Sequence, residues 1–247
     1  MEFFAKTDKG RKRRMNQDFV FATDQPLGSL PNLFLLADGM GGHRAGDYAS
    51  RFLVEQLRTE LSETAELPLV RLLEKKIGRV NEALYRLSME NESLRGMGST
   101  LVCAVIEDRT MTIANIGDSR AYLIHDGRIR QITRDHSFVE EMVGRGMMRR
   151  GSEEYQHSKN IITRAVGIEE TVEADFFELE LTEGDFVLLC SDGLSNMVDN
   201  ESMLSIALDS APVRSKTQAL IDMANINGGR DNIGVILIDP LGEETAV

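Results

Sequence analysis

Five aspartates of this chain stand beside residues that favour tight turns, and together they could bind divalent cations. They are Asp18, Asp38, Asp118, Asp192 and Asp231, most of them next to glycine or asparagine. Three of them follow apolar runs that predict strands, and paired strands can bring such ends to one rim of a sheet. We expect these carboxylates to lie there without matching Lys or Arg, so they would repel one another unless a metal cation lay among them. Oxygen ligands suit Mg²⁺ or Mn²⁺, whereas Zn²⁺ would require His or Cys.

Turn geometry alone explains any single one of these aspartates, so the prediction rests on all five. Two further residues could complete the site. Gly39 has no side chain, so its carbonyl oxygen could approach an ion closely. Arg13 precedes Asp18 by five residues, so its guanidinium could lie near the same rim and bind two oxygens of a phosphate. The alternatives are a flexible loop at Gly39 and a solvated surface charge at Arg13.

Cys103 and Arg109 have the spacing used by cysteine-dependent phosphatases, with five residues between them. That chemistry needs a glycine-rich loop of inward-facing amides around the anion. Here the intervening residues are a strand-like run followed by two carboxylates, which would repel phosphate. We therefore predict that Cys103 and Cys190, each inside an apolar run, are buried free thiols.

The elements that must position these residues follow from hydrophobic periodicity. Strands are predicted at 32–37, 99–106, 110–116, 121–125, 128–133, 186–190 and 234–239, and helices at 45–61, 69–87 and 201–225, the last interrupted at Pro212. The Asp126-Gly127 pair between two of the strands predicts a hairpin. Hairpins with helices in separate blocks indicate an α+β protein with mostly antiparallel sheet. Residues 137–161, rich in Gly and Arg, are predicted to form a mobile, partly helical insert.

Composition excludes several classes of protein. Among 247 residues, 28 Lys and Arg face 40 Asp and Glu, and the net charge of −12 argues against nucleic acid as a partner. The apolar runs are strand-sized, so we expect no membrane insertion. Charged residues follow Met1–Phe4 at once, so no signal peptide is predicted and we expect a cytoplasmic protein.

The order and spacing of the motifs resemble the metal-dependent protein phosphatases of the protein phosphatase 2C type, in particular their short bacterial branch. The resemblance runs from Thr7 to Ile238. The motifs are Arg13-x-x-Asn16-Gln17-Asp18, Asp38-Gly39-Met40-Gly41-Gly42, Gly98-Ser99-Thr100, Gly117-Asp118-Ser119-Arg120, Asp135-His136-Ser137, Thr163-Arg164-Ala165-Val166-Gly167, Ser191-Asp192-Gly193-Leu194 and Gly229-Arg230-Asp231-Asn232. The resemblance implies a four-layer αββα sandwich of two antiparallel sheets flanked by helix pairs. It also implies one catalytic domain over 1–247, with a flap insert at about 137–161.

The resemblance implies a role for each candidate metal ligand. Asp38 would bridge two Mn²⁺ or Mg²⁺ ions, and the carbonyl of Gly39 would bind one of them. Asp192 and Asp231 would hold the other ion. Asp18 would act in or just outside this set of ligands.

Three further roles follow from the same resemblance. Asp118, with Asp192, matches the place where bacterial members bind a third, weaker ion, and Arg13 matches the phosphate-binding arginine. Met40 stands where some members, chiefly eukaryotic, have a histidine proposed to protonate the leaving group. Another group or a metal-bound water must therefore serve as the acid here.

The implied activity is hydrolysis of phosphoserine and phosphothreonine in proteins by in-line attack of a metal-bridging hydroxide, without a covalent enzyme intermediate. Arg13, Asp38 and Asp118 would be the catalytic residues. We expect a monomer that opposes a bacterial Ser/Thr protein kinase and acts on its substrates. Two alternatives share the pattern: a related phosphatase dedicated to one regulatory protein in sigma-factor partner switching, and a non-catalytic binding module of the same fold.

Overall fold

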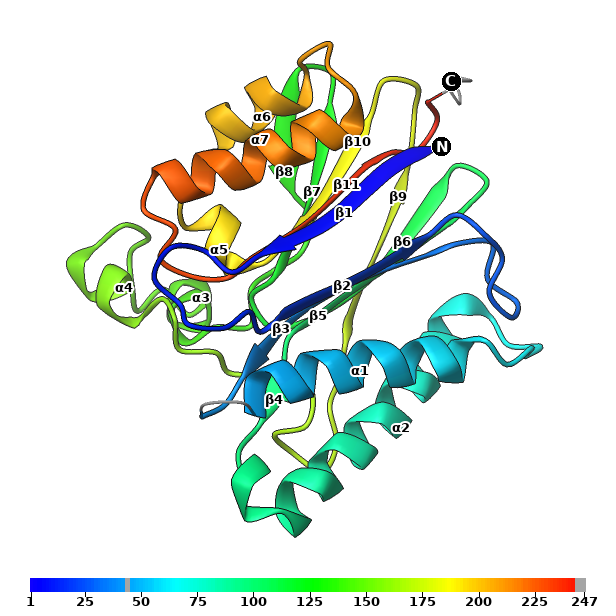
Figure 1. The fold of residues 1–247 in the computed structure, drawn as a ribbon, viewed down its shortest axis with the longest axis vertical. Coiled ribbons are helices and arrows are strands. Elements are labelled where there is room, and N and C mark those ends of the chain that lie inside the picture. The colour runs from blue at the N-terminus through cyan, green and yellow to red at the C-terminus, as the bar shows by residue number, and fades with distance from the viewer. Residues whose placement is uncertain (43–44, 243–247) are drawn as a thin grey trace.

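Two antiparallel sheets stacked face to face occupy the centre of the computed structural model, which describes residues 1–42 and 45–242 (Figure 1). One sheet has five strands in the order β1-β11-β10-β7-β8, and the other has six, in the order β2-β3-β5-β6-β9 with β4 paired to β3. The strands are β1 (Glu2–Asp8), β2 (Asp18–Thr23), β3 (Leu33–Met40), β4 (Gly98–Ser99), β5 (Leu101–Glu107), β6 (Thr110–Ile116), β7 (Arg120–His125), β8 (Arg128–Gln131), β9 (Asp175–Glu180), β10 (Phe186–Cys190) and β11 (Ile233–Asp239).

Helices cover the outer face of each sheet (Figure 1). Two long helices lie on the six-stranded sheet, and three helices lie on the other side, against the five-stranded sheet. The described helices are α1 (Ala45–Leu61), α2 (Leu69–Glu90), the 3₁₀ turn η1 (Glu92–Leu94), α3 (Phe138–Gly144), α4 (Glu153–Ser158), α5 (Asp192–Ser195), α6 (Asn200–Ala207) and α7 (Val213–Ile226).

Among the described residues, three hydrophobic cores hold the layers together. The core between the sheets includes Leu36 of β3 and Ile236 of β11, both fully buried. Leu35, the neighbour of Leu36 in β3, points the other way and packs against α1 and α2. Because successive side chains of a strand alternate faces, one apolar strand serves two cores. Each fully buried Leu or Ile contributes about 1.5–3 kcal/mol relative to exposure. The predicted four-layer α+β sandwich is confirmed.

The sequence predictions hold best where local signals are strong. Asp126 and Gly127 both have positive φ, 47° and 69°, as a two-residue turn between β7 and β8 requires, so the predicted hairpin is confirmed. Helices α6 and α7 are separated just before Val213 by Pro212, as predicted. Strands β1, β2 and β9 were not predicted.

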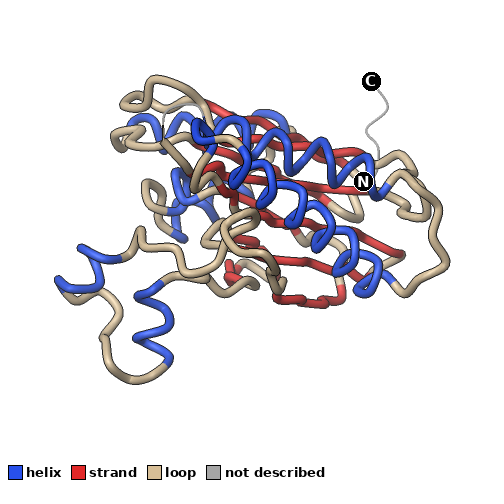
Figure 2. Tube along the Cα trace, turned by 90° about the horizontal axis from the view of Figure 1, so that it is seen from below, coloured by secondary structure: helices blue, strands red, loops and turns tan. Residues whose placement is uncertain are grey.

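The insert at 137–161 leaves the sandwich at one end, where Figures 1 and 2 both show α3 and α4 standing apart from the sheets. Each of these short helices starts at a serine, Ser137 or Ser152, whose hydroxyl accepts a backbone N–H of the first turn. The prediction of a partly helical insert is thereby confirmed. In the described ranges, no helix is long and apolar enough to cross a membrane.

Candidate active site

Two of the predicted carboxylates face each other across a pair of strands. Asp18 begins β2, and the antiparallel register places it opposite Asp38 of β3. The strand β3 continues to Met40, so Asp38 lies within the strand and not after it as predicted. Its backbone is fixed by Thr100, whose hydroxyl accepts the N–H of Asp38 at 2.9 Å. Antiparallel pairing thus brings together two carboxylates that are twenty positions apart in the sequence.

Gly39 is required here by close packing. A Cβ at this position would lie 1.9 Å from the carbonyl oxygen of Gly46 in α1, so any side chain would push the helix off the strand. The N–H of Gly39 donates to the carbonyl of Gln17 at 3.0 Å. The backbone around Gly39 is therefore held from two sides, and the alternative of a flexible loop is wrong for this residue.

A second close contact brings Asp192 and Asp231 together. Asp192 is the first residue of α5, directly after β10 and Ser191. A Cβ on Gly193 would lie 1.8 Å from the carbonyl oxygen of Asn232, so the start of α5 rests on the segment that carries Asp231. The absence of a side chain at position 193 therefore allows Asp192 and Asp231 to lie on the same side of the site.

Asp118 lies in the tight turn between β6 and β7. Gly117 has a φ of 100°, and its N–H donates to Nδ1 of the buried His136 at 3.0 Å. The N–H of His136 donates in return to the carbonyl of Gly117 at 2.9 Å. The turn that presents Asp118 is thus clamped by His136, whose role was not predicted.

These elements meet at one cavity of about 230 Å³. The predicted residues that line it are Arg13, Asp38, Gly39, Asp118, Asp192 and Asp231. Asp18 does not line the cavity; it is buried, and its Oδ2 accepts the hydroxyl of Ser191 at 2.7 Å. Six of the seven predicted site residues therefore line one cavity, and the seventh, Asp18, is buried behind them.

The carboxylates carry the electrostatic signature of crowded, buried like charges. Burial and neighbouring aspartates raise the pKa of Asp18 to about 8, of Asp118 to about 7 and of Asp192 to about 6. The pKa of Asp38 is also raised well above its ordinary value, by burial first and then by the charges of Asp18 and Asp192. A cation among them would relieve both causes.

One cation of the chain already contacts this group. The guanidinium of Arg13 lies 2.8 Å from Oδ2 of Asp231, so the expectation of carboxylates without basic partners is wrong at this position. A second pair, Arg120 with Asp135 at 2.7 Å, lines an adjoining cavity that Asp118 and Asp192 also line. Asp18, Asp38 and Asp118 have no ion pair within the described residues.

The donor set fits a hard divalent cation. All the side chains assigned as ligands offer carboxylate oxygens, the ligands that Mg²⁺ and Mn²⁺ prefer. Oδ1 of Asp18 and Oδ1 of Asp192 are buried without a hydrogen-bond partner, at a cost that a cation would remove. The carboxylates border the cavity without converging on one point: among the described residues, no three His, Cys, Asp or Glu side chains are arranged as a metal-binding group.

Two asparagines that organise the site were not predicted. The amide of buried Asn232 donates to the carbonyls of Lys9 and Met15 at 2.8 and 2.9 Å, which ties the loop of Arg13 to the start of β11. Asn196 donates to Oδ2 of Asp192 at 3.0 Å and accepts from Lys159 of the insert at 2.7 Å. In the sequence, Asn232 stood out only as the residue after Asp231, without a predicted role, and no pattern indicated a role for Asn196.

Neither cysteine takes part in the site. Cys103 and Cys190 are fully buried free thiols, as predicted, and burial raises the pKa of each to about 12. Arg109 pairs instead with Glu183 at 3.8 Å. A thiolate mechanism is therefore excluded on the structure as well as on the sequence.

The two-sheet sandwich is an architecture shared with serine/threonine phosphatases of known structure, and the family comparison agrees. The chain matches the protein phosphatase 2C family over residues 7–229 and belongs to that family. The predicted class of enzyme, a phosphoprotein phosphatase, is confirmed.

Relatives of known name and structure cover nearly the whole chain. It is 39% identical to the serine/threonine phosphatase stp of Listeria monocytogenes, with 95% of this chain and 94% of that protein covered. Its fold is similar to the serine/threonine phosphatase of S. agalactiae, with a TM-score of 0.89, 35% identity and coverage of 96% and 98%. It is also similar to the catalytic domain of the phosphatase PstP in complex with two manganese ions, with a TM-score of 0.83, 34% identity and coverage of 96% and 97%.

Proposed function

We propose that this protein is a Mn²⁺- or Mg²⁺-dependent phosphatase that hydrolyses phosphoserine and phosphothreonine in proteins. One observation carries the proposal: buried or partly buried aspartates from strands and turns far apart in the sequence border a single cavity, and burial together with their mutual repulsion raises the pKa values of Asp38 and Asp192. Such an arrangement is costly unless cations bind there. The manganese-bound relative supports the same choice of ion.

We assign the ligands as the sequence motifs suggested. Asp38 would contact two ions, Gly39 would bind one through its carbonyl, and Asp192 and Asp231 would hold the other. Asp118 and Asp192 also line a neighbouring cavity, the proposed place of a third, weaker ion. When bound, the ions would supply an activated water nucleophile and neutralise charge on the phosphoryl oxygens.

Asp18 is assigned a supporting role. It lies behind Asp38 and outside the cavity lining, with one oxygen held by the Ser191 hydroxyl and the other without a hydrogen-bond partner. The free oxygen can accept a hydrogen bond from a water bound to an ion. The negative charge of Asp18 also adds to the attraction for cations.

The remaining residues of the cavity would bind the substrate. The side chain of Arg13 is half exposed at the rim and can exchange the carboxylate of Asp231 for two phosphoryl oxygens. Among the described residues that line the cavity there is no Cys, Ser, Thr or His, which supports direct attack of water on phosphorus without a covalent enzyme intermediate. Met40 has no proton to donate, so it can act only by contact.

We further propose that one catalytic domain spans the chain, that residues 137–161 are a flap controlling access, and that the protein works as a monomer against a Ser/Thr protein kinase. Val139 of α3 and Tyr155 of α4 line the neighbouring cavity together with Asp118 and Asp192, which supports the flap. Two unpaired buried thiols and an acidic composition support a reducing, cytoplasmic location.

The test is hydrolysis of p-nitrophenyl phosphate and of phosphothreonine and phosphoserine peptides, with EDTA and with Mn²⁺ or Mg²⁺. We expect turnover only with metal, and a loss of several orders of magnitude in Asp38→Asn and Asp231→Asn. Glu107→Gln, at an exposed strand end far along β5, is the matched control. Full turnover in excess chelator would contradict the metal assignment. An enzyme that hydrolyses p-nitrophenyl phosphate but none of the phosphopeptides would contradict the substrate class.

A further inference from the structure

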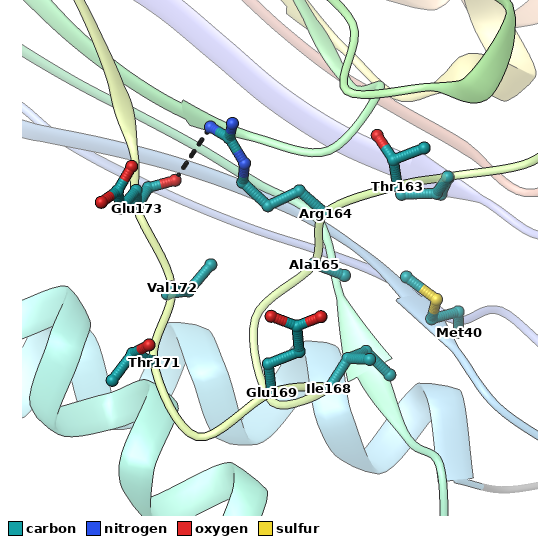
Figure 3. A pocket seen from close by; sticks show the side chains of 10 residues that line it. Met40, Thr163, Arg164, Ala165, Ile168, Glu169, Thr171, Val172 and Glu173 are labelled. Carbon is teal, nitrogen blue, oxygen red and sulfur yellow. Dashed lines mark hydrogen bonds between the residues drawn. The ribbon is translucent and has the colours of Figure 1, made fainter. Parts of the chain in front are cut away.

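A second and larger pocket, of about 380 Å³, lies beside the carboxylate cavity (Figure 3). It is enclosed mainly by the loop from Ile162 to Glu173, which leads from the insert into β9. Nothing in the proposed catalytic chemistry uses this pocket. Its volume falls in the range of pockets that bind small ligands or long side chains.

The two cavities are neighbours that share a wall. Met40 and Ile162 line both of them, and Met40 is the residue next to Gly39 in β3. A phosphorylated side chain placed among the carboxylates would therefore leave its flanking residues beside the second pocket. This continuity makes the pocket a place for the polypeptide of the substrate, not for the phosphoryl group.

The lining has an apolar part and one inward carboxylate. Met40, Ala165, Ile168 and Val172 provide the apolar surface, and Ile168 is 41% exposed, which is high for an isoleucine. Figure 3 shows the side chain of Glu169 rising from the loop toward the middle of the pocket. Within the described residues, Glu169 forms no ion pair.

The positive charge in the wall is already neutralised. Arg164 donates to Oδ1 of Asp175 at 2.8 Å and to the carbonyl of Glu173 at 3.1 Å. The carboxylate of Glu173 forms no ion pair in the described part of the chain and adds a second negative charge to the rim. The charges in the pocket wall that have no ion-pair partner within the described ranges, those of Glu169 and Glu173, are therefore negative.

Resting on the proposed function, we propose that this pocket binds a lysine or arginine side chain flanking the phosphorylated residue of the substrate protein. The aliphatic stem of such a residue would cover Met40 and Ile168, and its cationic head would meet Glu169. An acidic side chain would be repelled, and a purely apolar one would bury Glu169 without a partner. The pocket thus gives the enzyme a preference for basic sequences around the phosphorylation site.

The test compares phosphothreonine peptides that differ only in one flanking residue, Lys, Ala or Glu, placed at one position at a time. For the native protein with Mn²⁺ we expect one position at which Lys gives a kcat/KM about two- to fivefold above Ala, the range of a partly exposed ion pair. The difference should lie in KM and should shrink as ionic strength rises. Glu169→Gln should abolish the preference, and Glu169→Lys should turn it toward Glu.

Glu170→Gln is the matched control, because Glu170 is the next residue, is exposed and does not line the pocket. Turnover of p-nitrophenyl phosphate, which has no flanking residues, should be the same in all three variants and in the native protein. Peptide hydrolysis with no Lys preference at any position, or equal effects of Glu169→Gln and Glu170→Gln, would overturn the pocket assignment while leaving the proposed function intact. Absence of phosphatase activity with metal would instead overturn the proposed function, and this inference with it.

Discussion

The guanidinium of Arg13 lies 2.8 Å from Oδ2 of Asp231, although the two residues are 218 positions apart in the sequence. The pair joins the residue proposed to bind the phosphoryl group to a residue proposed to bind a metal ion. Asn232 makes this possible, because its amide ties the loop of Arg13 to the start of β11. Arg13 can therefore act as a removable partner that Asp231 gives up when an ion and a phosphate bind.

Arg13→Ala should raise KM for phosphopeptides roughly tenfold or more, because a charge-assisted hydrogen bond to the substrate is lost. Since Arg13 also competes with cations for Asp231, the Mn²⁺ concentration at half-maximal rate should stay the same or fall. Steady-state kinetics over a Mn²⁺ titration measures both quantities. Arg14→Ala is the matched control, as Arg14 is also exposed and does not line the cavity. Weakened metal binding with unchanged KM would place Arg13 with the ions instead.

Without metal, the stability of the protein should fall as pH rises. The raised pKa values of Asp18, Asp118 and Asp192, about 8, 7 and 6 against an ordinary 3.8, mean that the folded state binds more protons than the unfolded state in this window. The free energy of unfolding then decreases from about pH 4 to pH 8. His136, whose pKa is lowered by burial, opposes this trend as a single group.

Thermal unfolding in EDTA at pH 5, 6.5 and 8 checks the trend. Mn²⁺ should raise the melting temperature most at pH 8, where the carboxylates are charged, and should flatten the pH dependence. A melting temperature in EDTA that increases over this range would show that the aspartates are not crowded in solution.

Asp118→Asn should separate the third ion from the first two. Asp38, Gly39, Asp192 and Asp231 still supply their oxygens, so tight metal binding should persist, while turnover on phosphopeptides falls roughly ten- to hundredfold. In EDTA at pH 8 the variant should melt at a higher temperature than the native protein, because one of several repelling charges has gone. Calorimetry with Mn²⁺ and steady-state rates measure the two effects.

Asp126→Asn, in the exposed hairpin turn, is the control for loss of one aspartate. Native turnover in Asp118→Asn, or loss of all metal binding, would show that Asp118 only shapes its turn.

Which strands the sequence predicted, and which it did not, depends on how deeply each strand is buried. The unpredicted strands β1, β2 and β9 are all edges of their sheets, and most of their residues are only partly buried, so their apolar patterns are weak. The central strands β6 and β10, buried on both faces, were predicted with their observed bounds.

The site divides in the same way. The carboxylates could be predicted because most of them stand next to glycine or asparagine, although Asp38 lies within β3. The contacts of Arg13 with Asp231 and of His136 with Gly117 depend on how distant segments pack, and no local pattern encodes them.

The insert is connected to the site through Lys159, and that connection gives the last prediction. Lys159, just after α4, donates to Asn196 at 2.7 Å, and Asn196 donates to Asp192 at 3.0 Å. The positive charge also lowers the pKa of Asp192, against the larger effects of burial and of Asp231 that raise it. Lys159→Met should release the insert from Asp192. This loss of positioning outweighs the removal of one positive charge that repels cations, so the Mn²⁺ concentration at half-maximal rate should rise about three- to tenfold. Arg149→Met, at an exposed residue of the same insert, controls for loss of one charge.

Asn196→Ala should have the same effect as Lys159→Met, and the double variant should be no worse than either, because both break one chain of hydrogen bonds. Additive effects in the double variant, or a response in Arg149→Met as large as in Lys159→Met, would show that the insert acts by its overall charge and not through this contact.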